Sequence, residues 1–348
     1  MRVLQIAPHL PPPFEGVGTY AAALASTLAE RFGVETRFVV GDPAWNGGTG
    51  NGARPVAART AADLLAGLEG EETVLLHYVN YGYQRRGCPV WLAQAVRRWR
   101  RGGPERRLVT VFHEVYATGP PWRSSFWTLP LQQRIAAATA RASDALVTSL
   151  DLYVRRLGAA ASPEKTAVLP VFSTVGEPES PPPLAVRARR MVLFGGRGAR
   201  SRAYGELRPA LAAACRALEI EEIADVGPPL EDAPAVVEGV PVRRLGVLPP
   251  AEVGSLLLGS LAGFVAYPTF FLPKSTIFAA YCAHGLLPVC SWPQPIRDGE
   301  VAAGRHYWAG SGDPQAIAAA ARAWYAGHGL ARQAETFRCL LAGPGEEA

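Results

Sequence analysis

The stretch MVLFGGRGARSR, residues 191–202, decides the architecture, because it starts an α/β pattern for the second time in one chain. The apolar run from Met191 to Phe194 predicts a buried strand. Two glycines follow it directly, and an Ala-rich run near 204–218 predicts the next helix. A strand, a glycine loop and a helix in this order are typical of an open parallel sheet.

The same order opens the chain. A predicted strand at 3–7 precedes a Pro-rich loop, the glycines Gly16 and Gly18, and a helix from about Thr19 to Arg31. Further strand-like runs lie at 36–40, 73–76, 108–112, 145–148, 167–169, 222–226, 263–267 and 287–290, with helical runs at 89–101, 130–142 and 314–326. We therefore predict an α/β fold of two Rossmann-like parallel-sheet domains that face each other across a cleft.

A proline-rich stretch separates the two patterns. Residues 173–190 read STVGEPESPPPLAVRARR, a composition typical of a linker. We expect an N-terminal domain at 1–178, a linker at 179–190, a C-terminal domain at 191–329, and a final helix at 330–348 that crosses back to the N-terminal domain.

The composition excludes several classes of protein. With 348 residues, of which 49% are hydrophobic and 19% charged, the chain has enough apolar material for two cores and is not disordered or fibrous. Its net charge of +5 arises from 35 basic and 30 acidic residues, and only Lys165 and Lys274 are lysines. The window from Arg85 to Arg107 alone carries +7, from eight arginines and Glu105, so the positive excess is local.

Cysteine usage and hydropathy indicate the compartment. The five cysteines are widely spaced and form no CxxC pair or His/Cys cluster, which indicates free thiols and no metal site. The N-terminal apolar run is too short for a signal peptide, and no stretch approaches the roughly 18 apolar residues of a membrane span. We expect a cytoplasmic protein.

The basic window contains a predicted amphipathic helix. Apolar residues between Trp91 and Trp99 form one stripe at helical spacing. Four arginines lie off that stripe, namely Arg97, Arg98, Arg100 and Arg101. The segment is either a packed helix with a solvated face or a contact for an anionic acceptor or anionic lipid headgroups, peripheral at the inner face of a membrane. We expect no nucleic-acid partner, because no recognition module accompanies the window.

The first glycine loop, residues 16–21, reads GVGTYA and fits G-x-G-x-x-A. Glycines there let backbone N–H groups and a helix N-terminus approach an anion, so Gly16 and Gly18 are candidate phosphate or substrate contacts. The seven residues from His9 to Glu15 separate the motif from its strand, which weighs against an NAD site. The alternative is a flexible turn before a helix.

The second glycine loop adds arginines to its glycines. Guanidinium forks match the geometry of phosphate, and backbone amides add to them. Gly196, Arg197 and Arg202 are therefore candidate phosphate contacts. The alternative is a solvated loop in an arginine-rich protein.

Two histidines follow predicted strands. His113 comes directly after the strand at 108–112 and is expected to face the cleft, and His77 follows the strand at 73–76 in the same way. A structural histidine is the alternative for both.

A third candidate segment is Lys274-Ser275-Thr276, which precedes the helical run 277–284. Ser or Thr there is a natural N-cap, and the start of a helix favours anions. A compact ammonium in a chain that otherwise uses arginine indicates a specific role for Lys274, and a chance lysine is the alternative.

These segments resemble the retaining glycosyltransferases of the GT-B fold, family 4 type, over nearly the full length and in the family's order. Residues 1–28 are similar to the family's opening strand, loop and first helix, and residues 109–114 to a strand whose final histidine approaches the transferred sugar. Gly196-Arg197 resembles the Gly-Arg pair that opens the C-terminal domain, and Arg202 falls on a basic position that contacts the donor diphosphate together with that pair. Residues 283–289 resemble an A-x-G-x-P-V signature.

The chain departs from this family at two places. The first of the family's paired glycines falls on Glu15. Two glutamates that the family carries with seven residues between them fall on Leu272 and Ala280, and one of them normally holds the nucleotide ribose. Lys274 and Ser275 are candidates to take over phosphate binding in this loop.

The resemblance implies a hexosyltransferase-like, metal-independent enzyme that transfers a sugar from a nucleotide-sugar to an acceptor hydroxyl with retention, in glycan, glycolipid or natural-product synthesis. The N-terminal domain would take the acceptor and the C-terminal domain the donor, with no cofactor beyond the nucleotide-sugar. Catalytic roles would fall on His113, Arg197 and Arg202, and donor binding on Gly16, Gly18, Gly196, Lys274, Ser275 and Thr276.

Three alternatives stay open. The missing glutamates favour a GT-B protein without glycosyl transfer, either a coupling enzyme or a non-catalytic partner. The G-x-G-x-x-A motif, with Asp42 after the second strand, favours an NAD(P)-dependent oxidoreductase. The arginine window alone supports a nucleic-acid-binding or membrane-binding scaffold.

Overall fold

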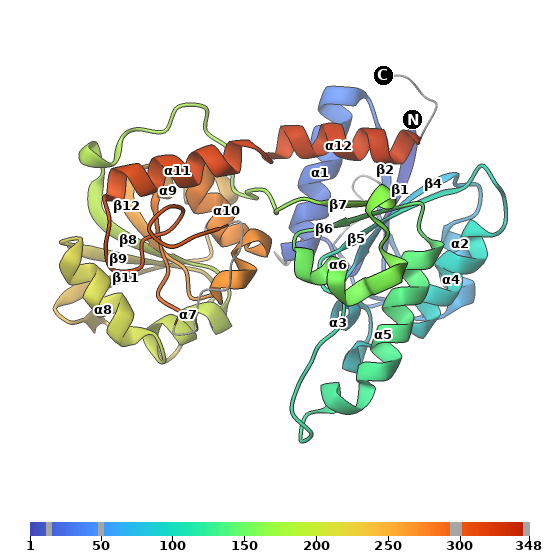
Figure 1. Ribbon diagram of the computed structural model, residues 1–348, viewed down its shortest axis with the longest axis horizontal. Coiled ribbons are helices and arrows are strands. Elements are labelled where there is room, and N and C mark those ends of the chain that lie inside the picture. Colours follow the sequence, from blue (N-terminus) through green and yellow to red (C-terminus); the bar gives the residue numbers. More distant parts are fainter. Residues whose placement is uncertain (12–15, 48–51, 293–300, 344–348) are drawn as a thin grey trace. The chain divides into compact units, whose positions relative to one another are not determined.

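A computed structural model describes residues 1–11, 16–47, 52–292 and 301–343, and it confirms the α/β fold. The chain divides into two compact units, each with its own sheet (Figure 1). Unit 1 comprises Met1–Pro170 and the segment that begins at Leu330, and unit 2 comprises Val171–Gly329.

Among its described residues, unit 1 has a seven-stranded parallel sheet in the order β3-β2-β1-β4-β5-β6-β7. Its strands are β1 (Arg2–Ala7), β2 (Glu35–Val40), β3 (Arg54–Pro55), β4 (Thr73–Tyr78), β5 (Arg107–Phe112), β6 (Ala145–Thr148) and β7 (Thr166–Val168). Five of these coincide closely with apolar runs in the sequence, because strands buried on both faces read as continuous hydrophobic segments.

The helices of unit 1 are α1 (Gly16–Phe32), α2 (Ala61–Gly67), α3 (Asn80–Tyr83), α4 (Val90–Arg100), α5 (Ser124–Ala142), α6 (Asp151–Leu157) and α12 (Leu330–Ala342), with short 3₁₀ turns η2 (Arg85–Gly87), η3 (Gly158–Ala160) and η4 (Pro163–Lys165). Helix α12 packs against α1, although it comes from the other end of the chain (Figure 1). Gln333 fixes this contact, since its Oε1 accepts a 2.9 Å hydrogen bond from the Tyr20 hydroxyl and its Nε2 donates to the Pro170 carbonyl at 2.6 Å.

The described residues of unit 2 form a six-stranded sheet in the order β10-β11-β9-β8-β12-β13, parallel except for the β10–β11 pair. Its strands are β8 (Ala188–Phe194), β9 (Glu222–Val226), β10 (Val236–Val237), β11 (Val240–Gly246), β12 (Ser260–Phe264) and β13 (Leu287–Val289). The helices are α7 (Arg197–Tyr204), α8 (Arg208–Ala217), α9 (Pro250–Leu258), α10 (Thr276–Ala283) and α11 (Pro314–Ala326), with 3₁₀ turns η5 (Leu184–Val186) and η6 (Thr269–Lys274).

Each sheet reverses its strand order beside its first strand. In unit 1, β1 lies between β2 and β4, and in unit 2, β8 lies between β9 and β12. The connections that follow the strands on the two sides of each reversal therefore run to opposite faces of the sheet. A crevice forms between them at the carboxyl ends of the strands, where open α/β sheets bind ligands.

The proline-rich stretch that the sequence assigns to a linker is tied into unit 2 by one buried side chain. The guanidinium of Arg187 donates to the carbonyls of Pro182, Leu257, Ser260 and His284. Burial lowers the pKa of Arg187 to about 10. The first segment of unit 1 ends at Pro170, the proline-rich stretch groups with unit 2, and β8 begins at Ala188.

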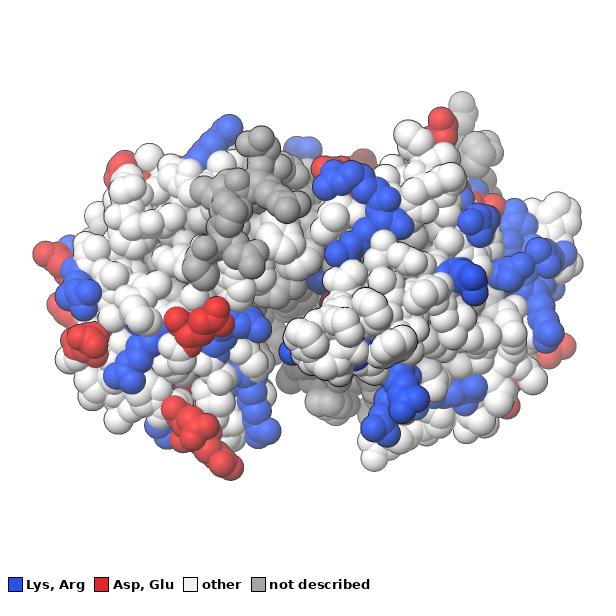
Figure 2. Space-filling view, turned by 60° about the horizontal axis from the view of Figure 1, so that its bottom comes forward, with Lys and Arg blue, Asp and Glu red and all other residues white. Residues whose placement is uncertain are grey.

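The net charge is divided unequally. Unit 1 carries 21 basic and 16 acidic residues, whereas unit 2 carries 14 of each, so the whole excess of +5 belongs to unit 1. Figure 2 shows this difference, with many blue and few red side chains over unit 1, on the right of the view.

Candidate functional site

Unit 2 has a cavity of about 210 Å³ at the carboxyl ends of β8 and β12. Its walls come from the end of β8, the first turns of α7, the segment after β12 and the start of α10, residues that lie far apart in sequence. Of the residues that line it, Arg200 and Lys274 are charged, and none is acidic. The cavity thus combines the crevice of the strand-order reversal with cationic side chains.

The first glycine of the loop after β8, Gly195, adopts a backbone conformation that favours glycine. Gly195 has φ +134°, and a Cβ placed there would lie 2.6 Å from Cδ1 of Ile277, a residue that lines the cavity. Gly227, in the loop after β9, has φ +148°, and its Cβ would clash with the Gly195 carbonyl. Glycine is therefore favoured at Gly195 by conformation, and at Gly227 both by conformation and by space, because a Gly227 Cβ would meet backbone.

The buried side chain of Arg200 holds this loop in place. It is buried and pairs with the buried carboxylate of Asp225, while its Nε donates to the Gly195 carbonyl at 3.1 Å. The hydroxyl of Tyr204 donates to the other oxygen of Asp225 at 2.8 Å. Sequence reasoning did not single out Arg200 or Asp225, because an arginine paired in the interior cannot be told from an exposed one by spacing.

The predicted catalytic arginines flank the cavity without lining it. Arg197 is exposed at the start of α7, and its Nε donates to the Pro229 carbonyl at 2.9 Å. Arg202 donates to the carbonyl of Ala266, a lining residue, at 3.1 Å, and its guanidinium lies 5.3 Å from the centroid of the Trp292 ring. Gly196 is exposed and caps α7.

Three predicted donor-binding residues meet at the cavity. Lys274, Ser275 and Thr276 all line it, where η6 passes into α10. The Ser275 hydroxyl oxygen is the N-cap of α10 and accepts from the Phe278 N–H at 3.2 Å. The Nζ of Lys274 lies 5.5 Å from the centroid of the Phe271 ring. A helix N-terminus beside an ammonium favours an anion here.

The two positions where the family carries glutamates are filled by buried apolar side chains. Leu272 and Ala280 are both fully buried. Neither is a lining residue of the cavity, so any ribose contact there must come from other groups.

Unit 1 brings His113 and His77 together. His77 lies within β4 rather than after it, and its Nδ1 is 3.1 Å from Nε2 of His113, which follows β5. The other nitrogen of His77, Nε2, lies 2.8 Å from Oε1 of Gln5. Burial lowers the pKa of His77 to about 3, so the ring is neutral and carries one N–H. We assign that hydrogen to Nε2, which leaves Nδ1 to accept from His113.

The glycines of the first loop differ in role. Gly18 is buried, and a Cβ there would lie 2.4 Å from the His9 carbonyl oxygen, so it allows α1 to pack on the chain after β1. Gly16 is exposed at the start of α1, with no atom near its Cβ direction. Glu15 lies outside the described residues.

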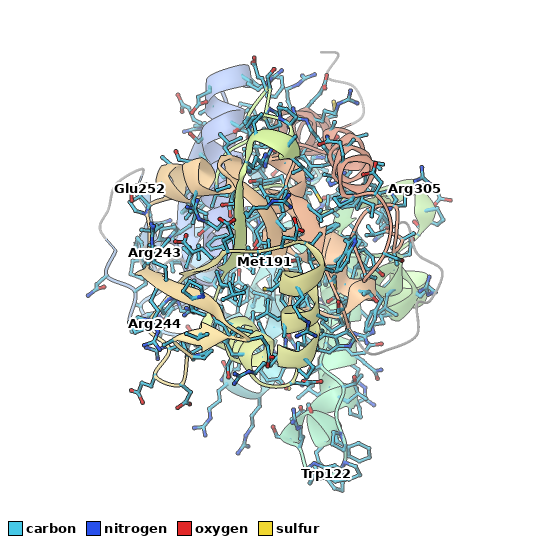
Figure 3. All side chains as sticks on the ribbon, turned by 90° about the vertical axis from the view of Figure 1, so that its left-hand side faces the viewer. Trp122, Met191, Arg243, Arg244, Glu252 and Arg305 are labelled. Carbon is cyan, nitrogen blue, oxygen red and sulfur yellow. The ribbon has the colours of Figure 1, made fainter. Side chains whose placement is uncertain are left out.

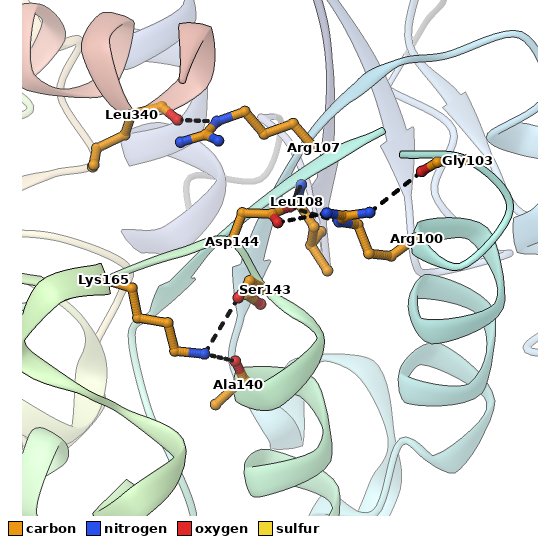
Figure 4. Close-up of polar contacts among 9 residues, drawn as sticks. All are labelled: Arg100, Gly103, Arg107, Leu108, Ala140, Ser143, Asp144, Lys165 and Leu340. Carbon is orange, nitrogen blue, oxygen red and sulfur yellow. Dashed lines mark hydrogen bonds and ion pairs between the residues drawn. The ribbon is translucent and has the colours of Figure 1, made fainter. Parts of the chain in front are cut away.

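The arginines at the end of α4 differ in exposure and in their partners. Arg98 and Arg101 are exposed and Arg97 is half-buried. Arg100 instead forms a two-pronged ion pair with Asp144, with both N–O distances 2.8 Å, and donates to the Gly103 carbonyl (Figure 4). Arg100 therefore stabilises the turn before β5 and does not belong to a free basic surface. Lys165 is structural as well, since its ammonium donates to the Ala140 and Ser143 carbonyls at the end of α5 (Figure 4).

Among residues 1–11, 16–47, 52–292 and 301–343, three His, Cys, Asp or Glu side chains nowhere gather in a metal-binding arrangement. No helix in the described ranges has the length and apolarity to cross a membrane.

Comparison with known proteins supports the fold. No protein-family model matches the chain, and no curated protein sequence matches it. Solved structures do match. HepE from Anabaena, in complex with UDP and glucose, has a TM-score of 0.61 at 14% identity over 97% of this chain and 99% of its own. Trehalose-6-phosphate synthase from Burkholderia multivorans has a TM-score of 0.56 at 13% identity over 98% and 96%.

A third similar structure is an alpha-glucosyltransferase in complex with UDP-glucose and DNA containing an abasic site. It has a TM-score of 0.51 at 13% identity, over 84% of this chain and 80% of its own. The chain thus has the GT-B fold, as the sequence predicted.

Proposed function

We propose that the protein is a glycosyltransferase that transfers a sugar from a nucleotide-sugar donor to an acceptor hydroxyl. The observation that carries this proposal is the unit 2 cavity, because it lies at the reversal of strand order and joins Lys274 to the N-terminus of α10. Similar structures with the GT-B fold contain UDP or UDP-glucose, which supports a nucleotide-sugar as the donor.

In this proposal the donor diphosphate lies at the start of α10. Lys274, Arg202 and the backbone N–H groups of the glycine loops stabilise the negative charge that develops as the sugar–phosphate bond breaks. The leaving phosphate accepts the proton of the acceptor hydroxyl, so that transfer with retention needs neither a side-chain base nor a metal ion. His113 contacts the transferred sugar, the role that the resemblance assigns to it. The basic unit 1 takes the acceptor, in carbohydrate biosynthesis at or near a membrane.

A second candidate is a GT-B protein that binds a nucleotide without transferring a sugar. The buried apolar side chains at Leu272 and Ala280 favour it, because the family uses carboxylates there. The two candidates share the binding step and differ in turnover.

Titration of the full chain with UDP, ADP and GDP, followed by thermal shift, tests the binding step. We expect one of them to stabilise wild type, and Lys274→Ala to abolish most of that shift. Arg216→Ala removes an exposed arginine that pairs with Glu238 on unit 2, and is the charge-matched control. No stabilisation by any nucleotide, or an equal shift in Lys274→Ala, contradicts the donor site.

Incubation with nucleotide-sugars then separates the two candidates. Release of the nucleoside diphosphate, detected by mass spectrometry, together with an α-linked product from an α-linked donor, supports retaining transfer. Tight binding of a nucleotide-sugar without any release supports the non-catalytic alternative.

A further inference from the structure

Unit 1 has a groove that the proposed donor chemistry does not use. It has a volume of about 690 Å³, lies wholly within unit 1, and its lining includes His9, Arg59, Tyr81, Arg85, Arg86 and Ser124. These residues come from the segments after β1 and β4, the segment before α2, and the first residue of α5. Three of the lining residues are arginines, and none is acidic.

Two of the three arginines lack an acidic partner. Among the described residues, no carboxylate forms an ion pair with Arg85 or Arg86, and both side chains are exposed. Arg59 does have a partner, since its guanidinium lies 3.0 Å from Asp42, whose other oxygen lies 3.5 Å from Nδ1 of His9. One carboxylate thus balances three guanidinium groups, and the groove keeps an excess of positive charge.

The backbone that presents Arg85 and Arg86 is fixed in an uncommon conformation. Arg86 has φ 70°, a value that residues other than glycine rarely adopt, and Gly87 follows with φ 69°. The buried amide of Gln132 holds this turn, because its Nε2 donates to the Arg86 carbonyl at 3.1 Å while its Oε1 accepts from Asn80 at 2.8 Å. The two guanidinium groups therefore extend from a turn that is formed before any ligand binds.

Neutral donors complete the groove. The Tyr81 hydroxyl oxygen lies 3.3 Å from Nε2 of Gln132, a nitrogen that cannot accept a hydrogen bond, so the phenol hydrogen is not used there and can donate to a ligand. Ser124 is the first residue of the 19-residue helix α5, whose N-terminus favours anions. The lining thus offers guanidinium, phenol and hydroxyl donors with an excess of cationic charge, which matches a phosphate ester.

We propose that this groove binds a phosphate group on the glycosyl acceptor, so that the acceptor is a phosphate ester. That the ligand is an acceptor rests on the proposed glycosyl transfer, whereas phosphate binding by the groove does not. Soluble sugar phosphates and lipid-linked phosphates share this chemistry. Two tryptophans near Ser124 favour the lipid-linked source, because both are exposed. Trp122 is 83% exposed and Trp127 is 73% exposed, and Trp122 projects from the end of this segment (Figure 3).

Isothermal titration of the full chain with glucose 6-phosphate tests the soluble source. We expect glucose 6-phosphate to bind, glucose not to bind, and the affinity to fall as salt is raised. The double variant Arg85→Ala/Arg86→Ala should weaken binding at least about tenfold, because charge-assisted hydrogen bonds to both guanidinium groups are lost. Arg141→Ala, which removes an exposed arginine of α5 outside the groove, should bind like wild type.

Flotation with phosphatidylcholine vesicles, with and without phosphatidic acid, tests the lipid source. Binding that requires phosphatidic acid, Arg85 and Arg86, and that weakens in Trp122→Ala/Trp127→Ala, identifies a lipid phosphate as the ligand. The proposal is overturned if neither probe binds, or if binding of either persists in the Arg85/Arg86 double variant.

UDP titration of the same variants keeps the two proposals apart. The Arg85/Arg86 double variant should keep the wild-type thermal shift with the nucleotide, because the donor cavity belongs to unit 2. If no nucleotide binds wild type while glucose 6-phosphate does, the donor site fails and the groove stands.

Discussion

His77 and His113 share a hydrogen bond within unit 1, with 3.1 Å between Nδ1 of His77 and Nε2 of His113. Burial lowers the pKa of His77 to about 3 from its ordinary value of 6.5. The folded protein therefore keeps this ring neutral, whereas the unfolded chain takes up a proton below about pH 6.5. The stability that His77 contributes is present above that pH and is lost as the pH falls towards 3, by about 1.4 kcal/mol per pH unit.

His77→Gln tests this relationship. We expect urea unfolding of wild type to become easier from pH 6.5 to pH 4, and His77→Gln to show a shallower decline, by about one proton. His284, His306 and His328 also have pKa values lowered by burial, but they are present in both proteins and cancel in the comparison. Identical slopes in the two proteins would contradict a neutral, buried His77.

The pair of Arg200 and Asp225 is predicted to support both the stability of unit 2 and its cavity. Asp225→Asn leaves Arg200 charged and buried without its partner, so we expect unit 2 to lose about 3–5 kcal/mol of unfolding free energy. The double variant Arg200→Met/Asp225→Asn should lose less than the sum of its single variants, because no unpaired charge remains. Urea unfolding measures these values.

Exposed ion pairs provide the control for that cycle. Arg216→Met breaks the surface pair with Glu238 and should change stability by less than about 1 kcal/mol. If the losses of unfolding free energy in the single variants at Arg200 and Asp225 were strictly additive, the ion pair between them would contribute nothing to stability.

Most strands were predictable because they are short apolar runs between polar or glycine-rich segments. Strands β3, β10 and β11 were not predicted, since β3 is the exposed dipeptide Arg54–Pro55 and no residue of β11 is buried. The run Ala145–Thr148 gave β6 at its observed bounds, whereas β12 lies at Ser260–Phe264 and not at the expected 263–267. Apolar residues continue past Phe264 into the cavity wall, so hydrophobicity alone does not mark the end of that strand.

Residues at the cavity were predictable where the position in the chain decides whether a side chain lines it, and not where a partner remote in sequence does. Lys274, Ser275 and Thr276 follow from a cap motif before a helix, and they do line the cavity. Arg197 and Arg200 lie in one loop-like sequence, yet the first is exposed and the second is buried against Asp225. Their difference depends on β9, which is remote in sequence.

Gly195 is predicted to be essential for donor binding. Its φ of +134° is strained for any residue with a Cβ, and a methyl group there would lie 2.6 Å from Cδ1 of Ile277, so Gly195→Ala must shift the loop or turn the Ile277 side chain in the cavity wall. We expect a loss of about 1–3 kcal/mol in stability and of most nucleotide binding by thermal shift. Gly198→Ala is the matched control, because a Cβ there meets no atom within 4 Å. Equal effects of the two variants would contradict the tight packing of the loop.

Gln132 is predicted to be the main support of the phosphate groove. Its buried amide accepts from the Ala117 N–H at 3.0 Å and donates to the Thr128 hydroxyl at 2.7 Å, in addition to the Arg86 turn. Gln132→Met keeps the volume but leaves buried polar groups unpaired, so we expect a loss of about 2–4 kcal/mol in urea unfolding. The same change at the exposed neighbour, Gln133→Met, should cost less than about 0.5 kcal/mol. If the folded Gln132→Met protein bound glucose 6-phosphate as tightly as the Gln133→Met protein, the turn would not need this amide to present its arginines.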